Sequence, residues 1–544
     1  MYNSDKITGR ILSAGTQPPF FLGICSKIRL LRIISSEGSV IIKDMLFSEL
    51  RDKISNARTV CSVDAEITGI TYDSRQVDRG FVFVAMKGGS FDGHDFIGEA
   101  LNAGASAIVA EREIADFASR GVPYVVVPNG RVAMGEIAAP FYGYPSRQMK
   151  LIGVTGTSGK TTVTHLVQSI FNASGSPAGL IGTLGARIGD ELIETKHTTP
   201  ESVDLQRILR MMSDRGVKVA AMEVSSHGLY QGRSLGCEFD CGVFTNIARD
   251  HLDFHKTPEA YLDAKLILFR DHPKMSDKIF HAAINADDPS AGKVIAATRG
   301  NVITFGIESE ADVKASDIVV TDKNVEFEMS YRDRSVHVTV PLGGWFNVYN
   351  ALSASAAAVA LGLDLDIIVE GLASVRPVPG RFESIECGQN FGVLVDYAHT
   401  PDELENVLRT AKSLTQNRLI AVFGCGGDRD RGKRPIMGGI GAALSDIVVI
   451  TSDNPRSEDP NAIIQDILQG IPEQERAKVD LVVDRKEAIR TALTRAQAGD
   501  LVVIAGKGHE DYQIFADRII HFDDREVARE ILSELGYCDG TYKS

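Results

Sequence analysis

The sequence lacks the features that stabilise small secreted proteins and those that cross membranes. Its seven cysteines are an odd number and are scattered, so they imply no disulfide framework. Cys237 and Cys241 lack a second pair of Cys or His residues at zinc-binding spacing. No stretch reaches the roughly 18 consecutive apolar residues of a membrane-spanning helix. We therefore expect a cytoplasmic protein in a reducing compartment, without a membrane partner.

The charge balance excludes another class of partner. The chain has 58 Lys and Arg residues against 72 Asp and Glu residues, a net charge of −14. Nucleic-acid binding needs clustered basic residues, so this excess of acid argues against such a partner, although a local phosphate pocket stays possible. Hydrophobic residues make up 44% and charged residues 24%, which argues against a disordered chain. At about 150 residues per domain, 544 residues suggest three or four domains.

Residues 1–44 differ from the rest of the chain. Their apolar residues are interrupted by two prolines and by Lys27 and Arg29, which is unfavourable for the core of a signal peptide. Met45 then opens the segment MLFSELRDKI, which is typical of the start of a domain. We predict that residues 1–44 are a disordered extension or reflect a mis-assigned start.

Three α/β segments follow. Residues 45–147 alternate short apolar runs with polar turns, and residues 148–379 begin with a strand, a Gly-rich loop and a helix. Residues 376–380 (RPVPG) predict a hinge. Residues 380–544 alternate buried strands with helices, as doubly wound domains do. We predict an α/β protein with a small N-terminal domain, a central phosphate-loop ATPase-like domain with a parallel sheet, and a C-terminal Rossmann-like domain.

The strongest local motif is LIGVTGTSGKTT at residues 151–162. Glycines let backbone N–H groups surround phosphates, and the N-terminus of the following helix adds a favourable dipole. Lys160 can neutralise the β- and γ-phosphates, and Thr161 is placed to bind Mg²⁺. Val154 stands where the usual spacing has a glycine. The strand–loop–helix context nevertheless predicts nucleotide binding rather than a glycine-rich turn without function.

Three downstream residues are candidate metal ligands. Glu223 ends a Val-rich strand, where a magnesium ligand is expected beside a phosphate loop; a solvated glutamate is the alternative. His251 follows another strand in a dense polar segment, as a second ligand or a structural histidine. Lys265 lies in an apolar helical run. It is either a surface lysine with a buried stem or a carbamate that binds Mg²⁺ through oxygen.

Together these motifs resemble the Mur ligase family. The matching segments are GTSGKTT at 156–162, EVSSH at 223–227, TNIARDHLD at 245–253, Lys265, GGWFNVYN at 343–350, GRFE at 380–383 and DYAHTP at 396–401. The altered glycine spacing is that family's own form. The resemblance runs from about residue 45 to the C-terminus and leaves residues 1–44 uncovered.

Within the family, the sequence is most similar to members that add the third peptide residue to UDP-N-acetylmuramoyl-L-Ala-D-Glu. This similarity rests on YDSR at 72–75, DG at 92–93, HTTP at 197–200 and Gln231-x-Arg233. It implies an ATP-dependent amide ligase that forms an acyl phosphate on the D-Glu side chain. The reaction belongs to cytoplasmic peptidoglycan precursor synthesis, and so to cell-wall biogenesis, cell shape and cell division.

The resemblance also implies the site residues. The catalytic residues would be Lys160, Glu223, His251 and Lys265. The ligands of Mg²⁺ would be Thr161, Glu223, His251 and Lys265 as a carbamate. ATP would contact Gly156, Thr157, Ser158, Gly159, Lys160, Thr161, Thr162, Asn347, Arg381 and Asp396, with Asn350 as a further candidate. The UDP-sugar would contact Tyr72, Ser74, Gly89, Ser90, Phe91, Thr198, Thr199, Ser225, Gln231 and Arg233. His227 is a candidate base for the attacking amine.

The third residue is either meso-diaminopimelate or L-lysine, and Asp453-Asn-Pro-Arg456 resembles the diaminopimelate form of the selectivity motif. An arginine binds the carboxylate of the extra amino-acid centre through its planar fork and would repel a lysine ammonium. A salt-bridged loop arginine is the structural alternative. The implied diaminopimelate-binding residues are Arg429, Asp453, Asn454, Pro455, Arg456, Gly506 and Glu510, with Glu510 pairing the distal ammonium.

The sequence alone does not exclude three other functions. They are a lysine-adding ligase, a folylpolyglutamate-synthase-like enzyme of the same family, and a phosphate-loop switch or transport ATPase. We expect a monomer that uses small-molecule substrates.

Overall fold

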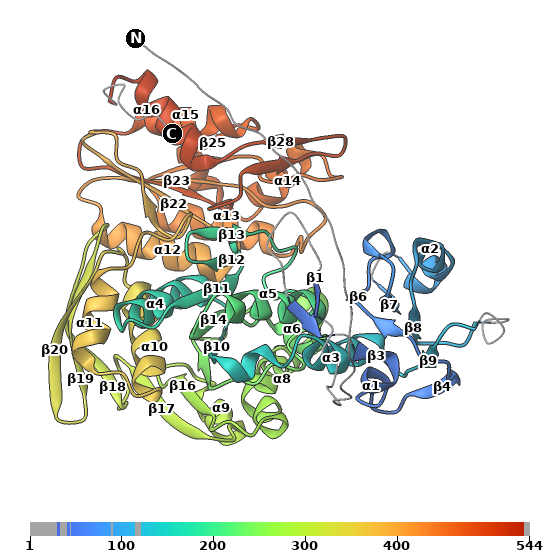
Figure 1. Ribbon diagram of the computed structural model, residues 1–544. Coiled ribbons are helices and arrows are strands. Elements are labelled where there is room, and N and C mark those ends of the chain that lie inside the picture. The colour runs from blue at the N-terminus through green and yellow to red at the C-terminus, as the bar shows by residue number, and fades with distance from the viewer. Residues whose placement is uncertain (1–29, 33–40, 44, 89–90, 115–120, 538–544) are drawn as a thin grey trace, which may run out of the picture.

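A computed structural model describes residues 30–32, 41–43, 45–88, 91–114 and 121–537. Figure 1 shows three α/β units, so the predicted fold class is confirmed. The expectation of disorder in residues 1–44 lies mostly outside the described residues; within them, β1 (Leu30–Arg32) pairs antiparallel with β2 (Ile41–Lys43). Among the described residues, no helix is long and apolar enough to cross a membrane.

The N-terminal unit is built on a five-stranded sheet with the order β4-β9-β8-β7-β6. Its alternating side chains fill two cores. Helices α1 and α3 cover one face and α2 covers the other. The elements are β3 (Met45–Leu46), α1 (Phe47–Arg51), β4 (Arg58–Cys61), β5 (Glu66–Ile67), β6 (Gly69–Thr71), β7 (Phe81–Ala85), α2 (Ile97–Ala103), β8 (Ala107–Ala110), β9 (Tyr124–Val126) and α3 (Gly130–Phe141).

The central unit contains an 11-stranded sheet with the order β13-β12-β11-β14-β10-β15-β16-β17-β18-β19-β20. Strands β11 to β18 of this order are parallel, as predicted, and both edges are antiparallel. The strands are β10 (Lys150–Thr155), β11 (Ala178–Gly182), β12 (Gly185–Ile188), β13 (Glu191–Ile193), β14 (Val219–Glu223), β15 (Cys241–Phe244), β16 (His281–Asn285), β17 (Asn301–Gly306), β18 (Val313–Val320), β19 (Val325–Tyr331) and β20 (Arg334–Val340).

Helices cover both faces of this central sheet. On one face lie α4 (Lys160–Ala173), α10 (Phe346–Ala360) and α11 (Leu365–Ala373). On the other lie α5 (Ser202–Asp214), α8 (Pro258–Arg270) and α9 (Ala291–Ala297). The short helices α6 (Ser226–Tyr230) and α7 (Leu252–His255) follow the carboxyl ends of β14 and β15. These ends are where α/β sheets bind ligands.

The C-terminal unit has a six-stranded sheet with the order β21-β22-β26-β23-β24-β25. Helices α12, α13 and α14 cover one face, and α15 and α16 the other, as in a doubly wound domain. The elements are β21 (Glu383–Ser384), β22 (Gly392–Asp396), α12 (Pro401–Leu414), β23 (Leu419–Phe423), α13 (Lys433–Leu444), β24 (Ile447–Ile450), α14 (Pro460–Leu468), β25 (Val479–Leu481), α15 (Arg485–Arg495), β26 (Leu501–Ala505), β27 (Tyr512–Ile514), β28 (Ile519–His521) and α16 (Asp524–Glu534).

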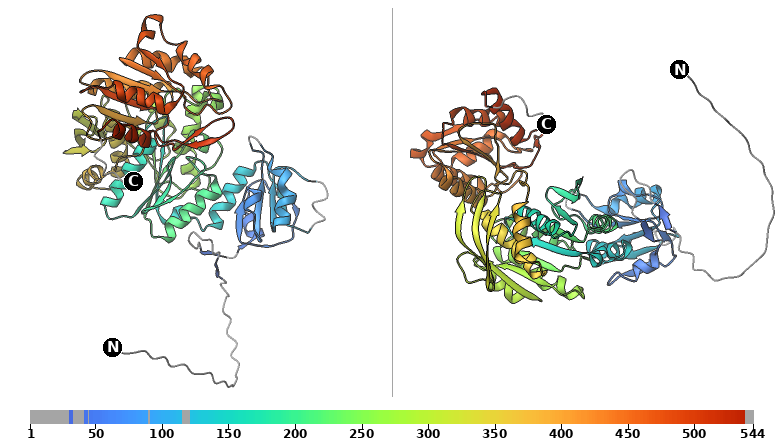
Figure 2. Two further views of the ribbon diagram at one scale, coloured as in Figure 1. Left: turned by 90° about the horizontal axis from the view of Figure 1, so that it is seen from above. Right: turned by 60° about the vertical axis from the view of Figure 1, so that its left-hand side comes forward.

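The units are arranged with the central one between the other two. Figure 2 shows the N-terminal unit in blue on one side of the central unit and the C-terminal unit in red on another. In the C-terminal unit, Cys387 is disulfide-bonded, which the odd cysteine count did not lead us to expect.

Candidate active site

The predicted phosphate loop joins β10 to α4 at the carboxyl end of the central sheet. Gly159 has a φ of +87°, a conformation that favours glycine. A Cβ at this position would lie 2.5 Å from Oδ1 of Asn350 on α10. The conformation of the loop therefore depends both on its own backbone and on the packing of α10 against it.

Two lysines meet at this loop. Lys160 Nζ donates to the carbonyl oxygens of Gly156 (3.0 Å) and Thr157 (2.6 Å). Lys265 Nζ also donates to the Gly156 carbonyl oxygen, at 2.7 Å, and lies 4.3 Å from the centroid of the Tyr261 ring. Lys265 is only 1% exposed, so the surface-lysine alternative is wrong. Burial and the charge of Lys160 hold the pKa of Lys265 well below its usual value, which favours the neutral amine, the form whose nitrogen can attack CO₂.

All four predicted metal ligands line one cavity of about 560 Å³. Glu223 is 1% exposed and accepts hydrogen bonds from Thr183 N (2.9 Å) and Thr183 Oγ1 (3.0 Å). Thr161 is 3% exposed in the first turn of α4, and His251 Nε2 lies 3.3 Å from Asp250 Oδ2.

The predicted ligands can be compared with the ligands that Mg²⁺ requires. Within the described ranges, no three His, Cys, Asp or Glu side chains are placed to hold a metal ion together. The predicted ligands include only two residues of these types, Glu223 and His251. The other two ligands are the Thr161 hydroxyl and the carbamate of Lys265. Glu223 is a buried carboxylate that makes no recorded ion pair in the described part of the chain, and Mg²⁺ prefers oxygen ligands. These residues fit a magnesium ion.

His227 lies beside His251, which lines this cavity. The His227 ring lies 4.6 Å from the His251 ring and 4.2 Å from the Phe254 ring, between centroids. Burial, followed by the neighbouring His251, lowers the pKa of His227 to about 4. His227 is therefore neutral at pH 7 and able to accept a proton, although a pKa this low makes it a weak base.

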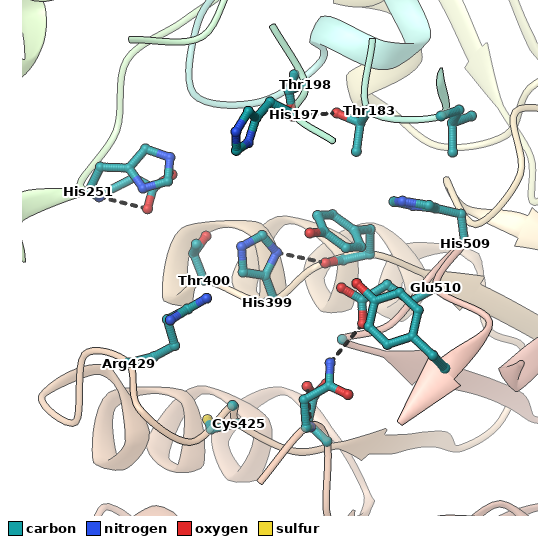
Figure 3. Close-up of a pocket in the computed structure, with 18 of the residues that line it drawn as sticks. Thr183, His197, Thr198, His251, His399, Thr400, Cys425, Arg429, His509 and Glu510 are labelled. Carbon is teal, nitrogen blue, oxygen red and sulfur yellow. Dashed lines mark hydrogen bonds and ion pairs between the residues drawn. The ribbon is translucent and has the colours of Figure 1, made fainter. Parts of the chain in front are cut away.

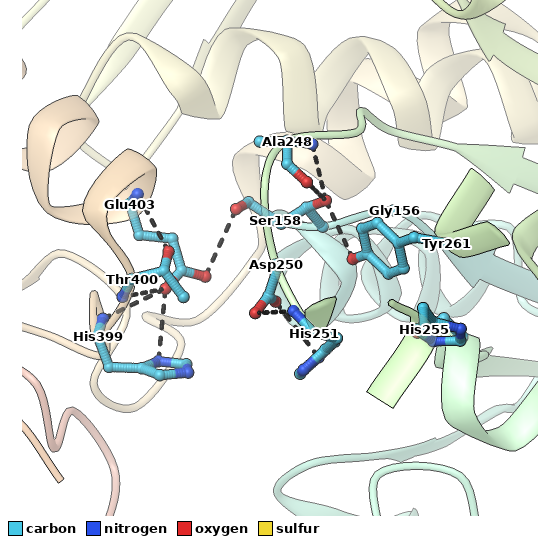
Figure 4. A network of polar contacts seen from close by, with 12 residues as sticks. Gly156, Ser158, Ala248, Asp250, His251, His255, Tyr261, His399, Thr400 and Glu403 are labelled. Atoms are coloured by element: carbon cyan, nitrogen blue, oxygen red, sulfur yellow. Dashed lines mark hydrogen bonds and ion pairs between the residues drawn. The ribbon is translucent and has the colours of Figure 1, made fainter. Parts of the chain in front are cut away.

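The C-terminal unit contributes His399 and Glu403 to the lining of this 560 Å³ cavity, called the nucleotide cavity below. Figure 4 shows both residues in the polar network beside the phosphate loop. Arg381 NH2 donates to Thr161 Oγ1 at 3.2 Å. Asp396 accepts 2.7 Å hydrogen bonds from two backbone N–H groups, and burial raises its pKa to about 6. Glu403 Oε1 lies 3.5 Å from Ser158 Oγ, within the phosphate loop. Sequence reasoning missed Glu403, although it lies next to the DYAHTP motif.

The predicted ATP contacts are brought together with one exception. The loop residues, Arg381 and Asp396 all line the cavity. Asn347 is 2% exposed and is not among the lining residues. Its side chain donates to the Gly343 carbonyl oxygen and accepts from Asn350 Nδ2, so it orients Asn350, which does line the cavity.

Sequence reasoning did not identify the aromatic wall of this cavity. Trp345, Phe346 and Tyr349 line it beside Asp287, and the Tyr349 hydroxyl donates to Asp287 Oδ2 at 2.9 Å. Trp345 and Phe346 stand within the matched GGWFNVYN segment, which was the available signal.

A second cavity of about 1130 Å³ lies between loops of the central and C-terminal units (Figure 3). Thr183, His251 and Tyr397 are among the residues that line both cavities, so the two are adjacent. Of the predicted diaminopimelate-binding residues, Pro455 is absent from the lining. Those that line it are Arg429, Asp453, Asn454, Arg456, Gly506 and Glu510.

Two opposite charges face this cavity. Arg456 NH1 donates to the Gly427 carbonyl oxygen at 2.8 Å, and Arg456 makes no recorded ion pair in the described part of the chain, which argues against the salt-bridged alternative. Glu510 Oε2 accepts from Asn454 Nδ2 at 2.8 Å and from Lys507 Nζ at 3.1 Å. A guanidinium and a carboxylate in one cavity suit the carboxylate and ammonium of an amino acid.

Several predicted UDP-sugar contacts lie at the junction of the N-terminal and central units. The Tyr72 hydroxyl donates to Asp204 Oδ2 of α5 at 2.8 Å. Ser74 opens a short 3₁₀ helix capped by Asp73. Phe91 is 75% exposed, whereas Gly89 and Ser90 lie outside the described residues. Tyr72, Ser74 and Phe91 line neither of the two cavities.

The other predicted contacts lie just before α5 and after β14. Thr198 lines both cavities and Ser225 lines the nucleotide cavity. Thr199 is fully buried and its hydroxyl donates to the Glu223 carbonyl oxygen at 3.0 Å. Arg233 NH1 donates to the Thr199 carbonyl oxygen at 3.2 Å. Gln231 Oε1 is buried without a hydrogen-bond partner in the described part of the chain.

Comparison with known proteins yields matches to three family models. The model of the Mur ligase family catalytic domain matches residues 66–142, that of the Mur ligase middle domain residues 154–358, and that of the Mur ligase glutamate ligase domain residues 380–508.

Curated relatives cover most of the chain. The UDP-N-acetylmuramoyl-L-alanyl-D-glutamate–2,6-diaminopimelate ligase of Bacillus licheniformis is 46% identical over 477 residues, which are 87% of this chain and 96% of the relative. The ligase of the same name from Geobacillus thermodenitrificans is 47% identical over 471 residues, 86% of this chain and 95% of the relative.

Solved structures share the fold. A structure of a ligase of that name is 36% identical, with a TM-score of 0.62, and the match covers 87% of this chain and 96% of the other. The MurF ligase from Thermotoga maritima in complex with ADP is 23% identical, with a TM-score of 0.57 and coverages of 86% and 96%.

Proposed function

The chain belongs to the Mur ligase family, and from this we infer that it is an ATP-dependent ligase adding meso-2,6-diaminopimelate to UDP-N-acetylmuramoyl-L-alanyl-D-glutamate. This reaction is a step of peptidoglycan precursor synthesis. The observation that carries the choice of amino acid is the pair of opposite charges, Arg456 and Glu510, in the cavity beside the phosphate loop. Diaminopimelate has a distal carboxylate and a distal ammonium, and each has a counterpart there.

The first step is activation of the D-Glu side-chain carboxylate, which is a poor acyl donor at neutral pH. Its oxygen attacks the γ-phosphorus of ATP, ADP leaves, and an acyl phosphate forms. Two anions must approach each other, so the step needs cationic shielding. Lys160 and Arg381 supply it from opposite units of the cavity.

Thr161, Glu223, His251 and carbamylated Lys265 would hold Mg²⁺ in this cavity. Two such ions, when bound, would neutralise charge on the transferring phosphoryl group. The environment of Lys265 supports the proposal of a carbamate. A buried neutral amine adds to CO₂, forms an N–C bond and loses a proton, which leaves an anionic group with oxygen ligands.

The second step joins the amino acid. A neutral amine of diaminopimelate attacks the acyl carbon, and phosphate leaves from the tetrahedral intermediate. His227, neutral at pH 7 and on the wall of the larger cavity, is a candidate for taking up the amine proton.

Domain closure excludes water from the acyl phosphate. Support comes from Arg381, which follows the hinge segment 376–380 and reaches Thr161 of the central unit. We further propose that the enzyme acts in the cytoplasm, as a monomer, on small-molecule substrates.

The decisive experiment measures phosphate release with ATP, Mg²⁺ and UDP-N-acetylmuramoyl-L-Ala-D-Glu, with mass detection of the product. Turnover is expected with meso-diaminopimelate and not with L-lysine. Turnover with lysine would contradict the interpretation of Arg456 as a residue that selects diaminopimelate. No turnover with either amino acid would contradict the substrate assignment. Phosphate release without any acceptor would favour a switch or transport ATPase.

A further inference from the structure

A buried lysine that the mechanism does not use lies behind the wall of the larger cavity. Lys507 follows β26, is fully buried, and is not among the residues that line the cavity. Its Nζ donates to Glu510 Oε2 at 3.1 Å and to Asn454 Oδ1 at 3.4 Å, and lies 5.4 Å from the centroid of the Tyr512 ring. A buried cation is costly unless it is paired, so its position calls for an explanation.

Lys507 belongs to a buried series of alternating charges. Arg485 pairs with Asp524 at 2.7 Å, and neither side chain is exposed. Burial alone would raise the pKa of Asp453, but Arg485 and Lys507 hold it below its usual value. The series runs from the core of the C-terminal unit to the cavity through Asp524, Arg485, Asp453, Lys507 and Glu510.

Removing Lys507 changes the charge around Glu510. Asp524, Asp453 and Glu510 of this series are negative, whereas Arg485 and Lys507 are positive, and Arg456 on the cavity wall supplies a further positive charge. Without Lys507, the surroundings of Glu510 become more negative by one unit. A more negative subsite favours a tail that ends in a bare ammonium over one that also carries a carboxylate.

Lys507 also fixes the orientation of Glu510. Together with Asn454 Nδ2, it occupies Glu510 Oε2, while Oε1 has no recorded partner in the described part of the chain. The carboxylate is thus held at one oxygen and can offer the other to a ligand.

We propose that Lys507 is a specificity-determining residue, which acts through Glu510 to make the ligase accept the zwitterionic tail of diaminopimelate and reject the bare ammonium tail of L-lysine. This inference rests on the proposed function, because it concerns the amino-acid substrate of that ligase. Lys507 touches no substrate itself and is a positioning residue. Its loss removes the positive charge that disfavours the ammonium of lysine and favours the carboxylate of diaminopimelate, and this effect reduces discrimination. The weaker hold on Glu510 affects both substrates alike.

The test is an internal competition. Wild-type enzyme and the variants receive ATP, Mg²⁺ and UDP-N-acetylmuramoyl-L-Ala-D-Glu with meso-diaminopimelate and a large excess of L-lysine. The two products differ in mass, so their ratio gives the ratio of the two kcat/KM values. Lys507→Gln keeps an N–H donor but no charge, and Lys507→Met removes both. Lys486→Gln on α15 is the matched control, since its side chain is 37% exposed and pairs with Glu530.

We expect the preference for diaminopimelate to fall about ten-fold or more in both Lys507 variants and to stay unchanged in the control. Merely structural damage would slow both products equally and leave the ratio unchanged. An unchanged ratio in Lys507→Gln, with wild-type thermal stability, would overturn the inference while wild-type turnover of diaminopimelate upholds the function. No product from wild-type enzyme with either amino acid would instead overturn the proposed function.

Discussion

At the scale of single residues, the phosphate loop shows two lysines in unlike roles. Both donate to the Gly156 carbonyl oxygen. Lys160 is part-exposed at the start of α4, where it can exchange its carbonyl partners for phosphate oxygens. Lys265 is fixed in the core of α8, where a charged ammonium is disfavoured. The sequence left the state of Lys265 open because an apolar helical stretch does not reveal which neighbours surround it.

Replacing Lys160 by Ala is expected to lower kcat by about 10²–10³-fold, the cost of losing one preorganised charge at the transferring group. The measurement is phosphate release at saturating substrates. Lys150→Ala is a suitable control, because Lys150 is exposed at the start of β10 and its Nζ donates to the Leu361 carbonyl oxygen, away from the phosphate loop. A Lys160→Ala variant as active as this control would show that Lys160 does not shield the phosphates.

At the scale of elements, buried parallel strands were the easiest to predict. Leu419–Phe423 and Leu501–Ala505 are continuously apolar runs in the sequence and form β23 and β26, because strands covered on both faces are apolar throughout. The antiparallel strands β18 to β20 were missed. Their side chains alternate between buried and exposed, so no apolar run marks them.

The loop between β10 and α4 makes a prediction at this scale. Gly159→Ala places a Cβ 2.5 Å from Asn350 Oδ1 in a backbone conformation that costs an L-residue roughly 1 kcal/mol or more. We expect ATP affinity, measured by calorimetry, to fall about ten-fold or more. Gly175→Ala is the matched control: Gly175 follows α4, has a φ of +75°, and a Cβ there meets open space. Equal losses in both variants would mean that packing against α10 is unimportant.

At the scale of the whole molecule, the site is assembled from separate units. The phosphate loop and Glu223 come from the central sheet, whereas Arg381, Asp396 and Glu403 come from the C-terminal unit. Folding of these units also buries histidines. Burial lowers the pKa of His227, His255 and His272 to about 4 and that of His509 to about 3.

These histidines predict that acid weakens the fold. Their pKa values are lower in the folded state than in the unfolded state, so folding stability is full above about pH 6.5 and is lost as the pH falls towards 4. His272, bonded to Ser234 and fully buried, accounts for about 2 kcal/mol of the loss between pH 7 and pH 5.

Urea unfolding at the two pH values measures this effect. His272→Gln is expected to lose about 2 kcal/mol less than wild type, whereas His337→Gln, on the exposed surface of β20, is expected to follow wild type. An identical loss in His272→Gln would show that His272 does not contribute to the acid sensitivity.

The sequence by itself determined the α/β class, the phosphate loop and the residue types of both subsites, because these depend on local apolar patterning and on short motifs. Tertiary structure decided the rest. It buries Lys265, and it places the Asn347 side chain against Asn350 instead of in the lining of the cavity. It also set Lys507 and Glu510 against residues more than 50 positions earlier in the chain. Such contacts depend on strand order and helix packing, which bring distant segments together and leave no periodicity in the sequence around any one residue.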